Sequence, residues 1–269
     1  MSGLPVPRTS SGRRALDAVL AAPARTLVAL DYDGTLAPIV ERPEDAVAAP
    51  GAADALRALA PLVGLVAVIT GRPAADAVRL GGFADVPSLV VLGHYGLERW
   101  SGGEITTPTT HSAVPHARVA AAMIVAGAPS GVWLEDKGHS VAIHTRGAAE
   151  PAAALETVRR PVEQLAKTTG LLVTPGKFVL ELRPPGTDKG GTLRAVVAET
   201  GPAAVVFAGD DLGDLAAVGA LRELPVPGLV ICSDSAETPA ALRDDADLVV
   251  AGAAGVVEWL MSLAAKIGG

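Results

Sequence analysis

Cysteine and aromatic residues are scarce in this 269-residue chain. The single cysteine, Cys232, excludes a disulfide within the chain, and its apolar surroundings, "GLVICSDS", are typical of a core side chain rather than a nucleophile. Aromatic residues make up 3% of the chain, and alanine and valine occupy the apolar positions instead. No stripe of basic residues alternates with aromatic ones, and the 22 basic residues against 29 acidic ones give a net charge of −7. We therefore expect no nucleic-acid partner.

Long hydrophobic runs are lacking as well. The stretch "LVGLVAVI" (62–69) is too short to cross a membrane, and "VVEWLMSLAAKI" (256–267) is interrupted by two charged residues. The first residues, "MSGLPVPRTSSGRR", do not lead into an apolar segment with a cleavage site. We therefore expect a cytoplasmic protein with no membrane partner, a monomer, whose residues 1–20 form a loose N-terminal arm.

What the chain has in abundance is short apolar runs separated by helical patterns. Hydrophobic residues make up 49% of the chain and charged residues 19%, which is enough to bury a core. Continuous apolar strands alternating with helices predict a parallel sheet covered on both faces, with its polar strand-end residues gathered at one edge. The expected strands are 27–30, 65–69, 89–92, 204–208, 228–232 and 247–250, and the expected helices are 51–60, 74–80, 189–200, 212–222, 236–243 and 253–267.

The pattern changes in the middle of the chain. Alternating strands and two helices there predict an antiparallel sheet with one covered face. The expected helices are 115–127 and 151–170, and the expected strands are 131–136 and 139–146, joined at Lys-Gly, and a hairpin over 171–184 around Pro-Gly. We therefore expect an inserted α+β lid domain at 108–186, between core segments 1–107 and 187–269, with Pro/Gly/Thr-rich hinges at 106–112 and 183–190.

Two carboxylates follow the first expected strand, in "LVALDYDGT". Because side chains alternate along an extended backbone, Asp31 and Asp33 are expected on the same side, and Gly34 allows a sharp turn after them. One carboxylate could attack a substrate while the other moves protons. The alternative is an ordinary aspartate-rich turn after a strand.

A second acidic cluster lies in "VVFAGDDLGDLAA" (205–217). Asp210 and Asp211 follow an expected strand, and Asp214 stands at the next helix start. Carboxylate oxygens without histidine or cysteine nearby suit a hard cation such as Mg²⁺. For Asp211 and Asp214 the alternative is capping of the helix.

Two further segments complete a possible phosphate site. Thr70 ends a strand in "VITGRP", where its hydroxyl and nearby backbone N–H groups could hold a phosphoryl oxygen. Lys189, in "TDKGGTL", brings a cation to another helix start. Taken singly, a threonine at a strand end is usually a helix cap and a lysine in a loop is usually solvated.

The order Asp-x-Asp, Thr, Lys, Asp-Asp resembles the haloacid dehalogenase superfamily of phosphotransferases. The resemblance implies a Rossmann-like α/β core with an inserted cap. It also implies that Asp31 is the nucleophile, that Asp33 is the general acid and base, and that Thr70 and Lys189 hold the transferring phosphoryl group. The implied Mg²⁺ ligands are Asp31, the backbone carbonyl of Asp33, and Asp210, with Asp211 and Asp214 nearby.

The cap segments "LEDKGHSVAIHTR" and "TPGKFVLELRPPGTDKGG", with "DYDGTLAPI", "ITGRP" and "GHYGLE", closely resemble the trehalose-6-phosphate phosphatases. That resemblance implies a Mg²⁺-dependent phosphatase that converts trehalose 6-phosphate to trehalose in the last step of trehalose biosynthesis. It implies these sugar-binding residues: Glu135, Lys137, Lys177 and Glu181, with Arg72, His94 and Arg146 at further positions of the motifs. Without the resemblance, the Glu-Lys pairs would be read as solvent-facing strand residues.

Three alternatives stay open at this stage. The substrate could be another small sugar phosphate, such as sucrose 6-phosphate or a glycosyl phosphoglycerate. A catalytically silent sugar-phosphate sensor would need the same binding residues, although the intact Asp-x-Asp pair argues against it. An interaction domain would require a large exposed apolar patch, which a sequence does not reveal.

Overall fold

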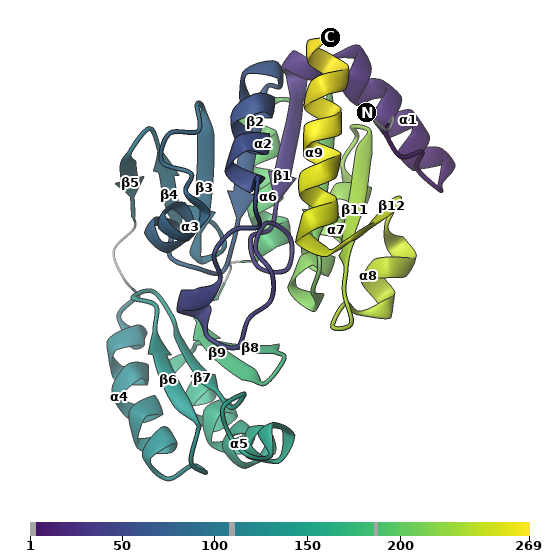
Figure 1. Cartoon of the computed structure of the whole chain (residues 1–269). Helices are drawn as coiled ribbons and strands as arrows, with labels where there is room; N and C mark the ends of the chain where they lie inside the picture. Colours follow the sequence, from purple (N-terminus) through teal and green to yellow (C-terminus); the bar gives the residue numbers. More distant parts are fainter. Residues whose placement is uncertain (1–3, 108–110, 186–187) are drawn as a thin grey trace. The chain divides into compact units, whose positions relative to one another are not determined.

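The computed structural model describes residues 4–107, 111–185 and 188–269. The chain divides into two compact units, a larger one made of Met1–Thr107 with Asp188–Gly269 and a smaller one made of Pro108–Thr187 (Figure 1). The two predicted hinges, 106–112 and 183–190, fall partly outside the described residues. A lid role for the smaller unit stays a prediction.

The larger unit is built on an eight-stranded sheet in the order β12-β11-β10-β1-β2-β3-β4-β5. The six strands from β12 to β3 are parallel, as their continuous apolar runs predict, and β4 and β5 add an antiparallel edge. The strands are β1 (Thr26–Leu30), β2 (Leu65–Ile69), β3 (Leu89–Gly93), β4 (Glu98–Ser101), β5 (Glu104–Thr106), β10 (Ala204–Gly209), β11 (Gly228–Asp234) and β12 (Leu248–Ala251).

Helices cover both faces of this sheet, because alternate residues of each buried strand pack in opposite directions. In β1, Val28 and Leu30 belong to the cluster under α1, α2, α3 and α9, whereas Leu27 and Ala29 pack with α6, α7 and α8. Burying each large aliphatic side chain contributes about 1.5–3 kcal/mol. The helices are α1 (Ser10–Ala21), α2 (Ala52–Leu59), α3 (Ala74–Gly81), α6 (Lys189–Thr200), α7 (Leu215–Glu223), α8 (Ala240–Asp245) and α9 (Gly252–Gly268).

The expected loose arm at residues 1–20 is wrong for the part of it that the structure describes. Helix α1 packs on the sheet through Ala15, Leu16 and Val19, all buried. The hydroxyl of Thr9 accepts a hydrogen bond from Gly12 N and caps the helix, and Arg8 donates to the backbone carbonyl of Ala246 over 2.8 Å. Pro5 and Pro7 precede this helix and Pro23 follows it, so no proline interrupts it.

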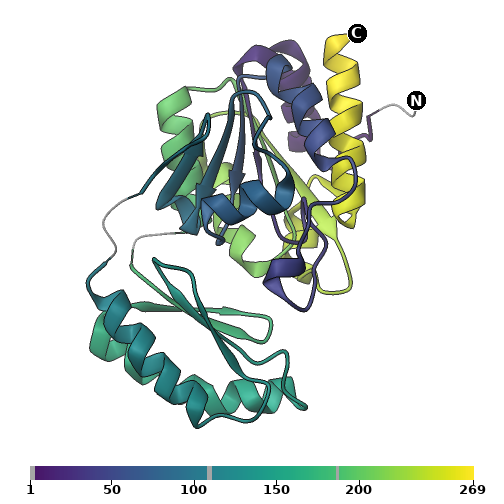
Figure 2. The ribbon, with the colours of Figure 1, turned by 60° about the vertical axis from the view of Figure 1, so that its left-hand side comes forward.

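The smaller unit has an antiparallel sheet in the order β6-β7-β9-β8, with α4 and α5 on one face (Figure 2). A cluster that includes Val158, Ile143 and Leu180 fills the space between the helices and the sheet. The elements are α4 (Ala113–Ala126), β6 (Trp133–Asp136), β7 (Val141–His144), α5 (Pro151–Thr169), β8 (Leu172–Gly176) and β9 (Val179–Arg183).

Both expected hairpins form, but their turns differ from the predicted ones. The last pair of β6 and β7 is Asp136 with Val141, so a four-residue loop over 137–140 replaces the tight Lys-Gly turn. Gly176 pairs with Val179, so the second turn consists of Lys177 and Phe178 rather than Pro-Gly. Phe178 takes a φ of 60° there, a left-handed conformation that the sequence did not suggest.

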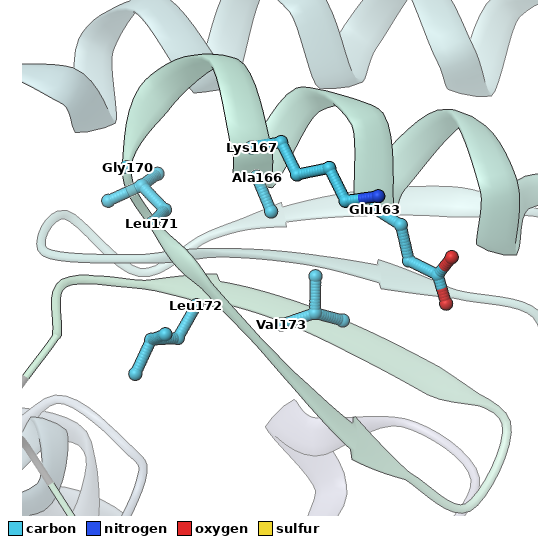
Figure 3. Close-up of a pocket in the computed structure, with 7 residues that line it drawn as sticks. All are labelled: Glu163, Ala166, Lys167, Gly170, Leu171, Leu172 and Val173. Carbon is cyan, nitrogen blue, oxygen red and sulfur yellow. The ribbon is translucent and has the colours of Figure 1, made fainter.

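A hollow of about 340 Å³ lies on the smaller unit between the end of α5 and β8. Figure 3 shows Val173 on the helix side of the strand and Leu172 on its other side, with Glu163 and Lys167 projecting from α5. None of the predicted site residues lines this hollow, so it is not the candidate site. Among the described residues, no helix is both long and apolar enough to cross a membrane.

Candidate active site

The polar residues that end β1, β2, β3 and β10 gather at one edge of the sheet. Leu30, the last residue of β1, pairs with Ala208 of β10 on one side and Val68 of β2 on the other. The chain order therefore reverses at β1, which is where parallel α/β sheets place their ligands. Asp31 follows β1 directly, and its backbone N–H donates to Ala208 over 2.9 Å.

A buried ionic cluster occupies this point of reversal. The Nζ atom of Lys189 lies 2.7 Å from Asp31 Oδ1 and 2.7 Å from Asp214 Oδ1. Asp210 completes the cluster from the end of β10, and all four side chains are at most 5% exposed. Lys189 reaches it because α6 begins at this residue, where Asp188 caps the helix by accepting from Gly191 N. The predicted convergence of Asp31, Lys189 and Asp210 is present in the structure.

Burial and mutual repulsion perturb these carboxyl groups strongly. Burial raises the pKa of Asp31 well above its usual range, and the opposing effect of Lys189 does not cancel it. Burial and the Asp214 carboxylate raise the pKa of Asp210 to about 8, and burial raises that of Asp214 to about 6. Burial alone would lower the pKa of Lys189, but Asp214 and Asp31 together raise it well above its ordinary value. One ammonium group thus faces three carboxyl groups. When these are ionised, the cluster has a net negative charge that a cation would balance.

The residues present fit a hard divalent cation. One carboxylate oxygen from each of Asp31, Asp210 and Asp214 lies within 4.8 Å of the others. Asp210 Oδ1 is buried and has no hydrogen-bond partner among the described residues. Oxygen donors of this kind suit Mg²⁺. Asp31 and Asp210 are the better candidates for direct ligands, because Asp214 already accepts hydrogen bonds from Lys189 and from the backbone N–H groups of Asp210 and Asp211.

Asp211, predicted as a possible metal ligand, lies outside this trio. Its exposed carboxylate accepts a hydrogen bond from Asp214 N and caps a short 3-10 helix, Leu212–Asp214, that precedes α7. The Asp214 carboxylate in turn accepts a hydrogen bond from Asp211 N, so the two residues form a reciprocal capping box. For Asp211 the structure therefore shows the capping role that the sequence left as an alternative.

The ionic cluster makes a prediction about pH. Asp210 has a pKa of about 8 in the folded chain against 3.8 in a free side chain, so the folded state binds more protons between these values. In protein stripped of divalent cations, the unfolding free energy is expected to fall as pH rises from 6 to 8, by on the order of 1 kcal/mol per pH unit. Thermal unfolding in a chelating buffer measures this, and added Mg²⁺ should remove the fall because it stabilises the ionised carboxylates. Stability that rises with pH in the metal-free protein would contradict it.

The loop after β1 is shaped by a glycine. The carbonyl of Tyr32 accepts hydrogen bonds from the N–H groups of Leu36 and Ala37, which folds the chain back on itself. Gly34 has a φ of 73°, and a Cβ atom there would overlap the Asp210 carboxylate. The hydroxyl of Ser233, at the end of β11, donates to the Gly34 carbonyl over 2.6 Å. No other residue type would allow this close approach of the loop to Asp210.

Asp33 has a different partner from Asp31. Arg72 holds both Asp33 oxygens, through Nη2 at 2.6 Å and Nε at 2.7 Å, and its guanidinium lies 5.5 Å from the centre of the Tyr32 ring. The Asp33 side chain is 44% exposed, whereas Asp31 is buried. The expected strand-like alternation does not apply because β1 ends at Leu30 and the chain turns.

Thr70 and His94 belong to two loops that are hydrogen-bonded to each other. Thr70 Oγ1 accepts from Arg72 N over 3.1 Å, and the Thr70 carbonyl accepts from Tyr95 N over 2.9 Å. His94 N donates to the Arg72 carbonyl, and the His94 ring is buried with Nε2 3.6 Å from Glu98. The backbone hydrogen bond from His94 N therefore supports the Thr70–Arg72 loop.

Tyr95 and Thr192 are residues of this site that sequence reasoning missed. His94 and Tyr95 both have positive φ values, 48° and 57°, which cost energy for side chains with a Cβ. Thr192, in the first turn of α6, donates to the Tyr95 carbonyl over 2.5 Å. These bonds connect the Thr70 loop to the helix that carries Lys189. The two glycines of "GHYG", which flank the strained pair, were the available signal.

In the smaller unit, the predicted sugar-binding residues Glu135, Lys137 and Glu181 lie together on the sheet face opposite α4 and α5. Lys137 Nζ is 3.4 Å from Glu181 and 3.7 Å from Glu135. Ser140 donates to Glu181 over 2.6 Å, and His144 Nε2 is 2.8 Å from Glu135. Sequence reasoning missed Ser140 and His144, although both stand within the quoted segment "LEDKGHSVAIHTR".

Lys177 and Arg146 form a separate group around one ring in the β8–β9 turn. The Arg146 guanidinium lies 5.8 Å and Lys177 Nζ 6.0 Å from the centre of the Phe178 ring. Two cationic groups therefore lie beside one aromatic ring in this turn.

The larger unit has the haloacid dehalogenase type of fold. A carboxylate follows its central strand, a lysine stands at the start of a helix, and aspartates follow the neighbouring strand, in the chain order that the sequence resemblance described. A haloacid dehalogenase-like hydrolase from Bacteroides thetaiotaomicron has this fold, with a TM-score of 0.60 over 87% of this chain and 98% of that chain at 16% identity.

Within that class, the chain belongs to the trehalose-phosphatase family, whose model matches residues 29–245. The trehalose-phosphate phosphatase of Mycobacterium avium is 35% identical over 214 residues, which are 76% of this chain and 53% of the relative. An uncharacterized glycosyl hydrolase of Mycobacterium tuberculosis is 37% identical over 219 residues, 77% of this chain and 16% of that protein. The chain thus spans about half or less of the length of these curated relatives.

A solved structure of the same family covers nearly the whole chain. The C-terminal domain of the Candida albicans trehalose-6-phosphate phosphatase has a TM-score of 0.77 over 98% of this chain and 99% of that chain, at 21% identity. At that identity the similarity establishes the fold, including both units, and assigns no residue a role.

Proposed function

We propose that this protein is a Mg²⁺-dependent phosphatase that hydrolyses trehalose 6-phosphate to trehalose and phosphate through an aspartyl-phosphate intermediate. The observation that carries the proposal is the buried Asp31 carboxylate, held 2.7 Å from Lys189 Nζ beside Asp210. Membership of the trehalose-phosphatase family supports the substrate. In this proposal Asp31, Asp210 and the Asp33 backbone carbonyl would hold Mg²⁺, which when bound neutralises charge on the phosphoryl group.

Asp31 is the proposed nucleophile. Its carboxylate oxygen attacks phosphorus, and the bond between phosphorus and the sugar oxygen breaks. Lys189 keeps the carboxylate oriented, and its charge offsets the repulsion between Asp31 and the anionic substrate. Thr70 is buried at the end of β2, where its hydroxyl would contact a phosphoryl oxygen. These residues supply orientation and charge, which are most of what phosphoryl transfer requires.

Asp33 is the proposed proton carrier. It donates a proton to the departing sugar oxygen, then removes a proton from the water that attacks the aspartyl phosphate and releases Asp31 and inorganic phosphate. In this structure Arg72 occupies both Asp33 oxygens. Asp33 must therefore exchange at least one of these hydrogen bonds for the sugar oxygen or the water. Its greater exposure than Asp31 favours this exchange.

The polar sheet face of the smaller unit is the proposed sugar site. Glu135, Lys137 and Glu181 provide both acceptors and donors at close spacing, which is the chemistry that a polyol requires. Their positions on the smaller unit, separate from the phosphate residues, would let this unit select the sugar while the larger unit performs the reaction. Closure of the smaller unit over the substrate would exclude water.

Phosphate release from a panel of sugar phosphates tests the proposal. We expect trehalose 6-phosphate to be hydrolysed with a kcat/KM at least about 100-fold above that of glucose 6-phosphate, because a second sugar ring adds several hydrogen bonds. Sucrose 6-phosphate and a glycosyl phosphoglycerate belong in the same panel, and either one as the best substrate would replace trehalose 6-phosphate in the proposal. Turnover should stop on chelation and return with Mg²⁺. Binding of these compounds without turnover would instead identify a silent sensor.

A further inference from the structure

The smaller unit places a tryptophan on its polar sheet face. Of the three tryptophans, Trp100 and Trp259 are at most 5% exposed and pack in the core of the larger unit, whereas Trp133 is partly exposed. In a chain with 3% aromatic residues, this position is unusual. Trp133 is paired directly with His144 across β6 and β7, and their rings stack at 4.0 Å with an interplanar angle of 6°.

The stacked histidine contacts a proposed sugar-binding carboxylate. His144 Nε2 lies 2.8 Å from Glu135 Oε2, and Glu135 stands two residues after Trp133 on the same face of β6. Stacking on Trp133 fixes the plane of the His144 ring. The contact with His144 Nε2 in turn fixes the position of the Glu135 carboxylate. Ordering a free glutamate side chain costs roughly 1.5–2 kcal/mol, so a contact made before the sugar arrives removes that cost from binding.

The fold itself does not depend on this pair. The buried cluster that holds the sheet against α4 and α5 comes from the opposite face and includes Ile143 and Leu180, but neither Trp133 nor His144. His144 is 16% exposed and Glu135 23% exposed, so both can be reached by a ligand. A stacked, hydrogen-bonded arrangement outside the core is the kind of support that a binding group needs.

We propose that His144, held by Trp133, is a positioning residue that presets Glu135 to accept hydrogen bonds from the sugar hydroxyls. The proposal rests on the proposed function, because it concerns the sugar side of the same substrate. It assigns His144 and Trp133 to recognition of the polyol and leaves the phosphoryl chemistry to the larger unit. Loss of the pair should therefore weaken substrate binding and spare the rate at saturation.

Four substitutions in the 269-residue chain test this assignment, and a fifth serves as the control. In His144→Leu and Trp133→Leu, the KM for trehalose 6-phosphate is expected to rise about tenfold, equivalent to about 1.4 kcal/mol, with kcat within about twofold of wild type. His144→Gln keeps an N–H donor for Glu135, and Trp133→Phe keeps a ring for stacking, so both should recover most of the loss. His116→Leu on α4, an exposed histidine away from this face, is the matched control and should leave KM unchanged.

The outcomes separate this inference from the proposed function. Wild-type protein that releases no phosphate from trehalose 6-phosphate overturns the proposed function, and the inference with it. If the wild type hydrolyses trehalose 6-phosphate and His144→Leu has an unchanged KM, the inference alone is overturned. A fall in the thermal midpoint of His144→Leu that His144→Gln shares, or equal KM values for these two variants, would show a structural role and also overturn it.

Discussion

Asp31→Asn is expected to reduce phosphate release from trehalose 6-phosphate by at least about 10³-fold, because an amide does not attack phosphorus and no other carboxylate takes its place. Asp214 contacts Lys189, Asp33 is held by Arg72, and Asp210 is the other proposed metal ligand. The measurement is phosphate released at saturating substrate and Mg²⁺. Residual activity close to that of wild type would contradict the proposed nucleophile.

The same substitution should preserve the fold or stabilise it. Burial raises the pKa of Asp31, which means that the folded chain disfavours its charge. A neutral amide removes that cost while Lys189 keeps its contact with Asp214. The thermal midpoint of Asp31→Asn in metal-free buffer is therefore expected to equal or exceed that of wild type. Asp76→Asn, on the exposed surface of α3, is the matched control for losing one carboxylate.

Lys189→Met is expected to have the largest effect on stability. Lys189 is 5% exposed and is the cation that contacts both Asp31 and Asp214, so its loss leaves buried carboxylates without a counter-charge. Removing one partner of a buried ion pair costs about 3–5 kcal/mol. Urea unfolding measured in a chelating buffer tests this. Phosphatase activity should be lost as well, because the phosphoryl group loses its ammonium partner.

Two comparisons make the lysine experiment specific. Lys167→Met on the exposed surface of α5 removes the same charge and should change the unfolding free energy by less than about 0.5 kcal/mol. Mg²⁺ should stabilise Lys189→Met more than wild type, because the cation meets a larger uncompensated charge. If wild type and Lys189→Met had equal urea midpoints, the buried cluster would carry no net charge without Lys189. That result would contradict the prediction.

The core of the fold could be predicted from the sequence because strand and helix periodicity are local properties. The apolar runs marked the six parallel strands, and the position of Lys189 at a helix start was correct. The predictions failed where local patterns were weak. Helix α1 is amphipathic but follows prolines, and the edge strands β4 and β5 are short and largely polar. The turn at Lys177 and Phe178 depends on strand register, which neighbouring strands determine.

For the candidate site as well, some features could be predicted from the sequence and others could not. Residue type, spacing and the chain order of the motifs predicted by themselves that Asp31, Thr70, Lys189 and Asp210 would lie at one edge of the sheet and form a phosphate site, because strand ends of a parallel sheet share an edge. Only the tertiary structure decided how each carboxylate is used: Asp214 holds Lys189, Asp211 caps a helix, and Asp33 is bound by Arg72, 39 positions along the chain. It alone revealed the stack of Trp133 on His144. The physical reason is that these roles follow from distances between side chains, which the folding of distant segments sets and which no local pattern encodes.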